Sequence, residues 1–259
     1  METVSHDGRD TAYRIVQRGG SDPTVLYVHG SGGSHRVWAH QYGPDGPSHP
    51  AAALDLSGHG ESDDIDTTAG PETLLAYAED VSAVARAVEA DVLVGNSLGG
   101  AVIQRILLDG DHEPAAAVLA GTGAALPVAE SLRTWLAEDF ERAVEWLHGT
   151  DRLFHDADEQ TRERSVETMY AVGRAVTERD FLSCHTFDVR EQLRDVQVPV
   201  LALVGEHDTL TPPSYHEVLA SELPRGDLTV LDDAAHLAMV DQPAAFNAAL
   251  ADFFDTHAP

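Results

Sequence analysis

The chain has 259 residues, of which 43% are apolar, enough for one large domain with a sizeable hydrophobic core. It carries 44 acidic and 16 basic residues, a formal net charge of −28, which disfavours a nucleic-acid partner because a phosphate backbone would be repelled. No apolar run reaches the roughly 20 residues that span a bilayer, and the N-terminal stretch METVSHDGRD lacks the pattern of a signal peptide. The one cysteine, Cys184, excludes an internal disulfide and a cysteine-based metal cluster.

The charge has an unusual composition, because every basic residue is arginine and lysine is absent. This composition resembles that of proteins from halophiles with a salt-filled cytoplasm; the alternative is an acidic protein from a GC-rich mesophile. In molar salt the Debye length falls to about 3 Å, so the self-repulsion of such a chain is largely screened. We therefore expect a cytoplasmic protein that needs molar salt to fold.

Along the chain, apolar patterns typical of strands alternate with patterns typical of helices. Short apolar runs predict strands at residues 25–28, 51–56, 92–94, 115–120, 200–204 and 228–231. Apolar residues at helical spacing predict helices at residues 72–90, 98–108, 213–222 and 243–255. Residues 12–16 and those before them are expected to form one or two antiparallel edge strands. The alternation predicts an α/β fold with a mostly parallel sheet, flanked by helices on both faces because the strands are apolar throughout.

Residues 125–190 interrupt this alternation, since they contain no convincing strand. An amphipathic stripe predicts a helix over 129–147, and residues 156–173 and 177–187 are also expected to be helical. The predicted organisation is a core of residues 1–124 and 191–259 with a helical insertion of residues 125–190. An insertion at the carboxyl edge of a parallel sheet lies where ligands bind, which favours a cap or lid over ordinary packing helices.

A single serine stands between glycines in Gly95-Asn96-Ser97-Leu98-Gly99, directly after a predicted strand and before a predicted helix. This is the pattern of a nucleophile elbow, in which small flanking residues let the strand and the helix approach each other. The five-residue pattern alone is only moderately specific. Its position between a strand and a helix is the stronger reason to consider Ser97 a nucleophile.

A serine nucleophile needs a base, and the base needs an acid that orients it. His236 follows the last predicted strand and Asp208 follows the strand before it, so both fall at the carboxyl ends of parallel strands, as Ser97 does. The chain order is Ser, Asp, His. Most of the 14 histidines must be bystanders, and Asp55 and Asp80 are less favoured alternatives for the acid.

Five motifs in order resemble the α/β-hydrolase fold with a helical cap: HGSGG at 29–33, DLSGHGES at 55–62, GNSLGG at 95–100, GEHD at 205–208 and HLAMVDQP at 236–243. The resemblance covers residues 12–256 and is least specific in the insertion. It implies an oxyanion hole formed by two backbone N–H groups, one from Leu98 and one from Ser31, with Gly32 as the alternative. It also implies acyl transfer, in which Ser97 attacks a carbonyl and a covalent acyl-enzyme is then hydrolysed.

Other residues in these motifs have structural interpretations. His29 and His59 are expected to hold their loops by hydrogen bonds, and His207 is expected to be a loop residue rather than the base. Cys184 lies among apolar residues and is expected in the core. Asn96 stands where esterases and lipases commonly have a histidine, so it leaves other reactions open.

The leading hypothesis is a serine carboxylesterase acting on small or medium acyl esters. The insertion supports it with large apolar side chains that either line a pocket or form the core of a cap: Trp135, Phe140, Trp146, Phe154, Met169, Tyr170 and Phe181. The alternative is a carbon–carbon bond hydrolase or a lactonase on the same fold, because GNSLGG also resembles the elbow of enzymes that cleave ring-fission diketones. Epoxide hydrolases and haloalkane dehalogenases are disfavoured, since they have Asp in place of Ser97.

A third hypothesis is a non-catalytic, ligand-binding homologue, because a fold does not dictate function. The expected partner is a small acyl substrate. No cofactor and no metal are expected, since neither a dinucleotide fingerprint nor the spacing of a metal motif is found in the sequence. The oligomeric state is not predicted.

Overall fold

The computed structural model describes residues 1–18, 23–44, 46–110 and 112–258. Their strands form one eight-stranded sheet in the order β1-β2-β4-β3-β5-β6-β7-β8. From β4 to β8 all neighbouring strands are parallel, whereas β2 is antiparallel to both of its neighbours. The α/β fold, the mostly parallel sheet and the antiparallel N-terminal edge are therefore confirmed. The strands are β1 Glu2–His6, β2 Arg9–Val16, β3 Val25–Val28, β4 Ala51–Leu54, β5 Val92–Asn96, β6 Ala116–Ala120, β7 Val200–Gly205 and β8 Gly226–Leu231.

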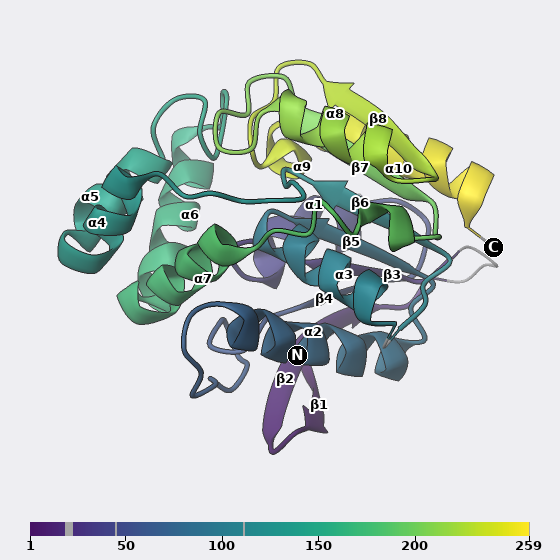
Figure 1. Ribbon diagram of the computed structural model, residues 1–259, viewed down its shortest axis with the longest axis horizontal. Helices are drawn as coiled ribbons and strands as arrows, with labels where there is room; N and C mark the ends of the chain where they lie inside the picture. Colours follow the sequence, from purple (N-terminus) through teal and green to yellow (C-terminus); the bar gives the residue numbers. More distant parts are fainter. Residues whose placement is uncertain (19–22, 45, 111, 259) are drawn as a thin grey trace.

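Helices cover both faces of the sheet, and four more extend to one side of it (Figure 1). The helices packed on the sheet are α1 Ala39–Tyr42, α2 Pro71–Val88, α3 Leu98–Asp109, α8 Pro213–Glu222, α9 Ala238–Asp241 and α10 Pro243–His257, with short 3₁₀ helices at His35–Trp38 and Leu193–Asp195. The four at the side are α4 Glu130–Glu138, α5 Phe140–Leu147, α6 Glu159–Val172 and α7 Arg174–Thr186. All four lie between β6 and β7 in the chain, within the predicted insertion.

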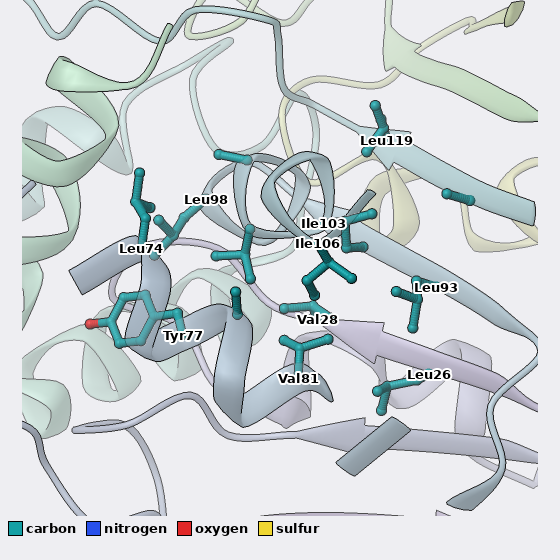
Figure 2. Close-up of a cluster of buried hydrophobic side chains, with 14 of the residues drawn as sticks. Leu26, Val28, Leu74, Tyr77, Val81, Leu93, Leu98, Ile103, Ile106 and Leu119 are labelled. Atoms are coloured by element: carbon teal, nitrogen blue, oxygen red, sulfur yellow. The ribbon is translucent and has the colours of Figure 1, made fainter. Parts of the chain in front are cut away.

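Two hydrophobic clusters arise because successive residues of a strand point to opposite faces of the sheet. On β3, Leu26 and Val28 belong to the cluster with α2, α3 and α8, whereas Tyr27 belongs to the cluster with α1, α9 and α10. Figure 2 shows Leu26, Val28 and Leu93 of neighbouring strands beside Ile106 of α3. The strands β3 to β7 are therefore buried on both faces, whereas the edge strands β1 and β8 are partly exposed.

The single helix predicted over 129–147 is wrong, because the chain breaks at Asp139 into α4 and α5. Asp139 has φ −144° and ψ 73°, and its carboxylate accepts a hydrogen bond from Arg142 N at 3.2 Å. Asp139 therefore caps the N-terminus of α5 and ends α4, although the apolar stripe of the sequence continues across this break. The other helical stretches of the insertion are present as α6 and α7.

The insertion leaves and rejoins the sheet at one place, since Ala125 and Asp188 pair in an isolated antiparallel bridge. Its helix α7 packs against α2 and α3 of the core. Among the helices of the described residues, none has the length and apolar character needed to cross a membrane.

Candidate active site

The turn from β5 into α3 is centred on Ser97, which has φ 54° and ψ −115°. A non-glycine residue in such a conformation costs about 1–3 kcal/mol and persists only where its surroundings enforce it. The glycines on either side provide the space. A Cβ on Gly95 would lie 2.5 Å from the carbonyl group of Gly99, and a Cβ on Gly99 would lie 2.5 Å from Val28 O. The sequence GNSLG therefore forms a strained elbow at the carboxyl end of β5.

The backbone of Ser97 is fixed while its hydroxyl is left available. Ser97 N donates to Ala120 O at 2.9 Å, and the Thr122 hydroxyl donates to Ser97 O at 2.8 Å. Within the described residues, the Ser97 hydroxyl itself has no hydrogen-bond partner, His236 included. In enzymes without ligand such bonds are often long and form only in the complex with substrate.

His236 and Asp208 form a buried pair, 5% and 2% exposed, in the loops after β8 and β7. His236 Nδ1 lies 2.9 Å from Asp208 Oδ2. The other carboxylate oxygen of Asp208 accepts the N–H groups of Leu210 and Thr211, each at 2.8 Å. Burial alone would raise the pKa of Asp208, but the charge of His236 and these hydrogen bonds lower it below its usual range. An ionised Asp208 holds the proton on Nδ1 and leaves Nε2 of His236 as the acceptor.

Ser97 and His236 line the same cavity, which has a volume of about 1090 Å³. The side-chain amide of Asn96 connects the end of β6 to the loop that carries His236. It donates to Ala120 O at 3.3 Å and to His236 O at 3.2 Å. Four of the large apolar residues predicted for the insertion line this cavity: Trp146, Phe154, Met169 and Phe181. The other three lie away from it: Trp135, Phe140 and Tyr170.

The loop after β3 packs directly on the elbow, because a Cβ on Gly30 would lie 3.0 Å from Ser97 Cβ. In this loop the N–H of Gly32 is already engaged, since it donates to a carboxylate oxygen of Asp180 at 3.0 Å. The N–H of Ser31 has no acceptor among the described residues, and Leu98 opens α3, where an N–H has no partner within the helix. Ser31 is therefore better placed than Gly32 to donate to a ligand.

Asp180 is a fully buried carboxylate on α7 of the insertion, and it connects the insertion to three elements of the core. Besides the N–H of Gly32, it accepts the Tyr77 hydroxyl at 2.7 Å and lies 2.9 Å from His59 Nε2. Burial alone lowers the pKa of His59, but the charge and hydrogen bond of Asp180 outweigh it, so the pKa is raised. Conversely, burial raises the pKa of Asp180, while His59 and the other donors lower it below the usual value. A raised pKa for His59 and a lowered pKa for Asp180 are the shifts expected when the two side chains form an ion pair.

A family model described as the alpha/beta hydrolase family matches residues 25–249 of the chain. The chain belongs to this family. It is therefore an α/β-hydrolase, an enzyme, with the predicted fold confirmed. The solved structure of a thermophilic esterase is 30% identical, with a TM-score of 0.84 over 98% of this chain and 96% of that one.

The alignments with two curated relatives of this α/β-hydrolase also cover most of both proteins. A pimeloyl-(acyl-carrier protein) methyl ester esterase of Yersinia enterocolitica is 26% identical over 249 residues, 91% of this chain and 94% of that protein. A 3-oxoadipate enol-lactonase of Acinetobacter baylyi is 24% identical over 266 residues, 93% of this chain and 92% of that protein. The structure of Est816, an N-acyl homoserine lactone degrading enzyme, shares the fold at 23% identity, with a TM-score of 0.83 over 97% of this chain and 100% of that one.

The alternative acids of this α/β-hydrolase lie elsewhere. Asp55 is fully buried, and its carboxylate accepts the backbone N–H of His35 and contacts the His35 ring. Burial alone would raise the pKa of Asp55, but His35 and its other partners hold that pKa at about 2. Asp80 bonds Arg9 and accepts Ser57 N. Neither bonds His236 in the part of the chain that the structure describes, so Asp208 is the carboxylate paired with it.

The loop histidines behave as predicted. His29 Nδ1 contacts Gly30 O at 2.8 Å, and its Nε2 accepts Leu56 N at 3.1 Å. Burial lowers the pKa of His29 to about 4, which matches a neutral ring that donates on one side and accepts on the other. Cys184 is 4% exposed, and burial raises its pKa to about 12, as expected for a core thiol.

Three contributors were not predicted from the sequence: Thr211, the amide of Asn96 and Asp180. The hydroxyl of Thr211 donates to Asp208 Oδ2 at 2.8 Å, and the Asn96 amide supports the His236 loop. The spacing Asp-x-x-Thr after β7 is a turn signal that could have indicated Thr211. Asp180 carries no comparable signal, because it lies 148 residues from Gly32 in the chain.

Proposed function

We propose that this α/β-hydrolase is a serine carboxylesterase for small or medium acyl esters, with Ser97 as nucleophile, His236 as base and Asp208 as the acid that orients it. One observation carries the proposal. A strained, glycine-flanked serine and a buried Asp208–His236 pair open onto one largely apolar cavity. This is the arrangement that acyl transfer needs.

The chemistry follows from the protonation states. His236 Nε2 takes the hydroxyl proton as Ser97 Oγ attacks the acyl carbon, and Asp208 stabilises the imidazolium that forms. The N–H groups of Ser31 and Leu98 stabilise the oxyanion of the tetrahedral intermediate. His236 then returns the proton to the departing alkoxide. The same ring then deprotonates a water molecule as it attacks the acyl carbon. The bond between the acyl carbon and Ser97 Oγ breaks, Ser97 Oγ takes the proton back from His236, and the acid is released.

Asp180 has a positioning role in this proposal. Its carboxylate holds the N–H of Gly32, which fixes the orientation of the adjoining Ser31 backbone beside Ser97. Because the carboxylate belongs to α7, docking of the insertion and formation of the oxyanion loop are parts of one structure.

Residues 125–190 act as a cap in this proposal, since they provide much of the apolar wall of the cavity. Four charged residues of the lining are exposed and include both signs: Arg36, Glu61, Arg164 and Glu167. Asp55 also lines the cavity, and it is buried and paired with His35. An uncharged apolar acyl or alcohol group therefore fits the interior better than a charged one, because burying an unpaired charge is unfavourable.

A lactonase is the second candidate, and its support comes from the enol-lactonase and the homoserine lactone enzyme among the similar proteins. A lactone is a cyclic ester, so the same nucleophile and the same oxyanion hole serve both reactions. The two substrates differ in shape, because the acyl and alcohol halves of a lactone are joined in one ring.

The test is a substrate panel in molar KCl that contains p-nitrophenyl acetate and butyrate, a lactone, an amide and a vinylogous diketone. Hydrolysis of the short esters, abolished by Ser97→Ala, supports the esterase. Faster opening of the lactone supports the second candidate, and turnover of the diketone alone supports carbon–carbon cleavage. No turnover above that of Ser97→Ala for any substrate contradicts all three.

A further inference from the structure

A cluster of metal-binding side chains lies outside the cavity, where the loop after α5 meets the loop after β7. Asp151 Oδ1 lies 2.7 Å from His155 Nδ1, and the ring of His155 stacks on that of His207, with centroids 3.9 Å apart and planes at 11°. One donor atom from each of the three residues lies within 4.8 Å of those of the other two. The side chains are partly open to solvent, at 37% for Asp151, 28% for His155 and 36% for His207.

Two more carboxylates complete the surroundings of His207. Glu206 Oε1 lies 3.4 Å from His207 Nε2, and donor atoms of Glu206, His207 and Asp233 also lie within 4.8 Å of one another. His207 is therefore common to two groups of three potential ligands. Two imidazoles and three carboxylates therefore gather at one place on the described part of the chain.

The backbone that carries these side chains is held in place by hydrogen bonds. A single carboxylate oxygen of Asp241 accepts both His155 N and Ala235 N, each at 2.9 Å. The Thr209 hydroxyl donates to Asp151 O, and Glu206 accepts Asp233 N at 2.9 Å. Ligands on a fixed backbone need only side-chain rotation to bind an ion, so little ordering opposes binding.

The donor set selects the class of ion. Imidazole nitrogens together with carboxylate oxygens suit Zn²⁺ and Ni²⁺, whereas Ca²⁺ and Mg²⁺ prefer oxygen ligands alone. A zinc–nitrogen distance of about 2.0–2.1 Å places two nitrogens of a tetrahedral site about 3.4 Å apart. Partly exposed rings at the observed separation reach this arrangement by rotation about their side-chain bonds.

We propose that Asp151, His155 and His207 bind one divalent transition-metal ion of the zinc or nickel class, with Glu206 and Asp233 beside it. Such an ion would join the insertion to the loops of the Asp208–His236 pair, because His236 N donates to the carbonyl of the residue after Asp151. The ion would stabilise this junction and take no part in the acyl-transfer steps. The site is independent of the proposed function, since it is read out by binding and melting rather than turnover.

The experiment uses the full chain without a histidine tag, freed of metal by a chelator and dialysed against Zn²⁺ in molar KCl. We expect one Zn²⁺ per chain and a higher melting temperature with Zn²⁺ than without it. His155→Gln and His207→Gln should each weaken binding by at least about tenfold. The matched control is His257→Gln, since His257 also lies beside a carboxylate, 3.3 Å from Asp227, but in neither cluster.

Unchanged Zn²⁺ affinity in a chain that carries both His155→Gln and His207→Gln would overturn the site. So would displacement of Zn²⁺ by an equal concentration of Ca²⁺, which would show a general attraction to the acidic surface. The visible spectrum of wild-type protein with Co²⁺ needs no variant. Bands of a nitrogen-ligated ion support the site, and the spectrum of hydrated Co²⁺ contradicts it.

Discussion

The parallel sheet and the helical insertion follow their sequence patterns to different degrees. Every strand expected from β3 to β8 is present, with ends within about two residues of the prediction. The strands β3 to β7 are buried on both faces and end where the core ends, whereas β8 is a partly exposed edge strand. The insertion was predicted to be helical, but its first helix is two helices. Its segments bury only one stripe, so their ends depend on local caps such as Asp139. Apolar patterns therefore locate core strands better than they locate helix ends.

The two regions also differ in what they bring to the site. The sheet presents Ser97, Asp208 and His236 at the carboxyl ends of its strands, whereas the insertion contributes cavity walls and the buried Asp180. The strand ends that carry the three site residues are positioned by close backbone contacts, such as those at Gly95 and Gly99, which leave no space for a larger residue. The contribution of the insertion rests on side chains, most of which can adjust. Four perturbations, taken from the largest expected effect to the smallest, test this difference.

The largest difference in stability is expected between alanine substitutions at Gly95 and at Gly149. At each glycine an added Cβ would lie at the same distance from its nearest neighbouring atom. On Gly95 it would lie 2.5 Å from the backbone of Gly99, and on Gly149 it would lie 2.5 Å from the far end of the Arg152 side chain, which can rotate away. We expect Gly95→Ala to lower the free energy of unfolding by at least about 3 kcal/mol. Gly149→Ala should stay within about 1 kcal/mol. Urea unfolding of both variants measures this, and equal losses would contradict the contrast between rigid sheet and adaptable insertion.

The exception within the insertion is Asp180, whose removal leaves His59 as a buried group without its charged partner. We expect Asp180→Asn to lower stability by about 3 kcal/mol, because breaking a buried ion pair is costly. It should also lower kcat more than it raises KM, since the oxyanion loop loses its anchor at Gly32. The control is Asp64→Asn, which removes only the exposed partner of Arg179 and should cost less than about 1 kcal/mol. An unchanged kcat in a folded Asp180→Asn would show that the loop is positioned without the insertion.

Salt should act on both regions together, because acidic residues outnumber arginines in each. Screening of a net charge of −28 is expected to raise the melting temperature by about 5–10 °C between dilute buffer and molar KCl. Scanning calorimetry measures this, with a single transition at both salt concentrations. A melting temperature independent of salt would refute the halophilic interpretation of the composition. Two transitions would show that the insertion unfolds separately.

The smallest effect is the pH dependence of the His59–Asp180 pair. The pKa of His59 is raised, so its contribution is complete below its unfolded value of 6.5 and is lost as pH rises through the folded pKa. The pKa of Asp180 is lowered, so its contribution is complete above 3.8 and is lost as pH falls through the folded value. The stability gap between wild type and Asp180→Asn should therefore be widest between pH 3.8 and 6.5. A gap that is constant from pH 3 to about 9 would show that the pair is not ionic.

The sequence allowed a prediction of the fold and of the residues proposed for catalysis, because strand ends in a parallel sheet converge at one edge. That rule, together with the chain order Ser, Asp, His, predicted the Asp208–His236 contact. What could not be predicted depends on contacts between distant segments. Ser31 was the favoured donor and Gly32 the alternative, and the bond from Gly32 N to Asp180 could not be predicted. His155 gave no metal motif because His207 lies far along the chain.

The central proposal, that Ser97 is the nucleophile, is tested most directly by covalent labelling with a fluorophosphonate in molar KCl, with peptide mapping and the rate of p-nitrophenyl butyrate hydrolysis measured on the same samples. We expect one label per chain, on Ser97, with activity falling in proportion to labelling. Ser97→Ala should be unlabelled and slower by about 10⁴-fold or more. A label on another residue, or a folded Ser97→Ala that keeps its activity, would contradict it.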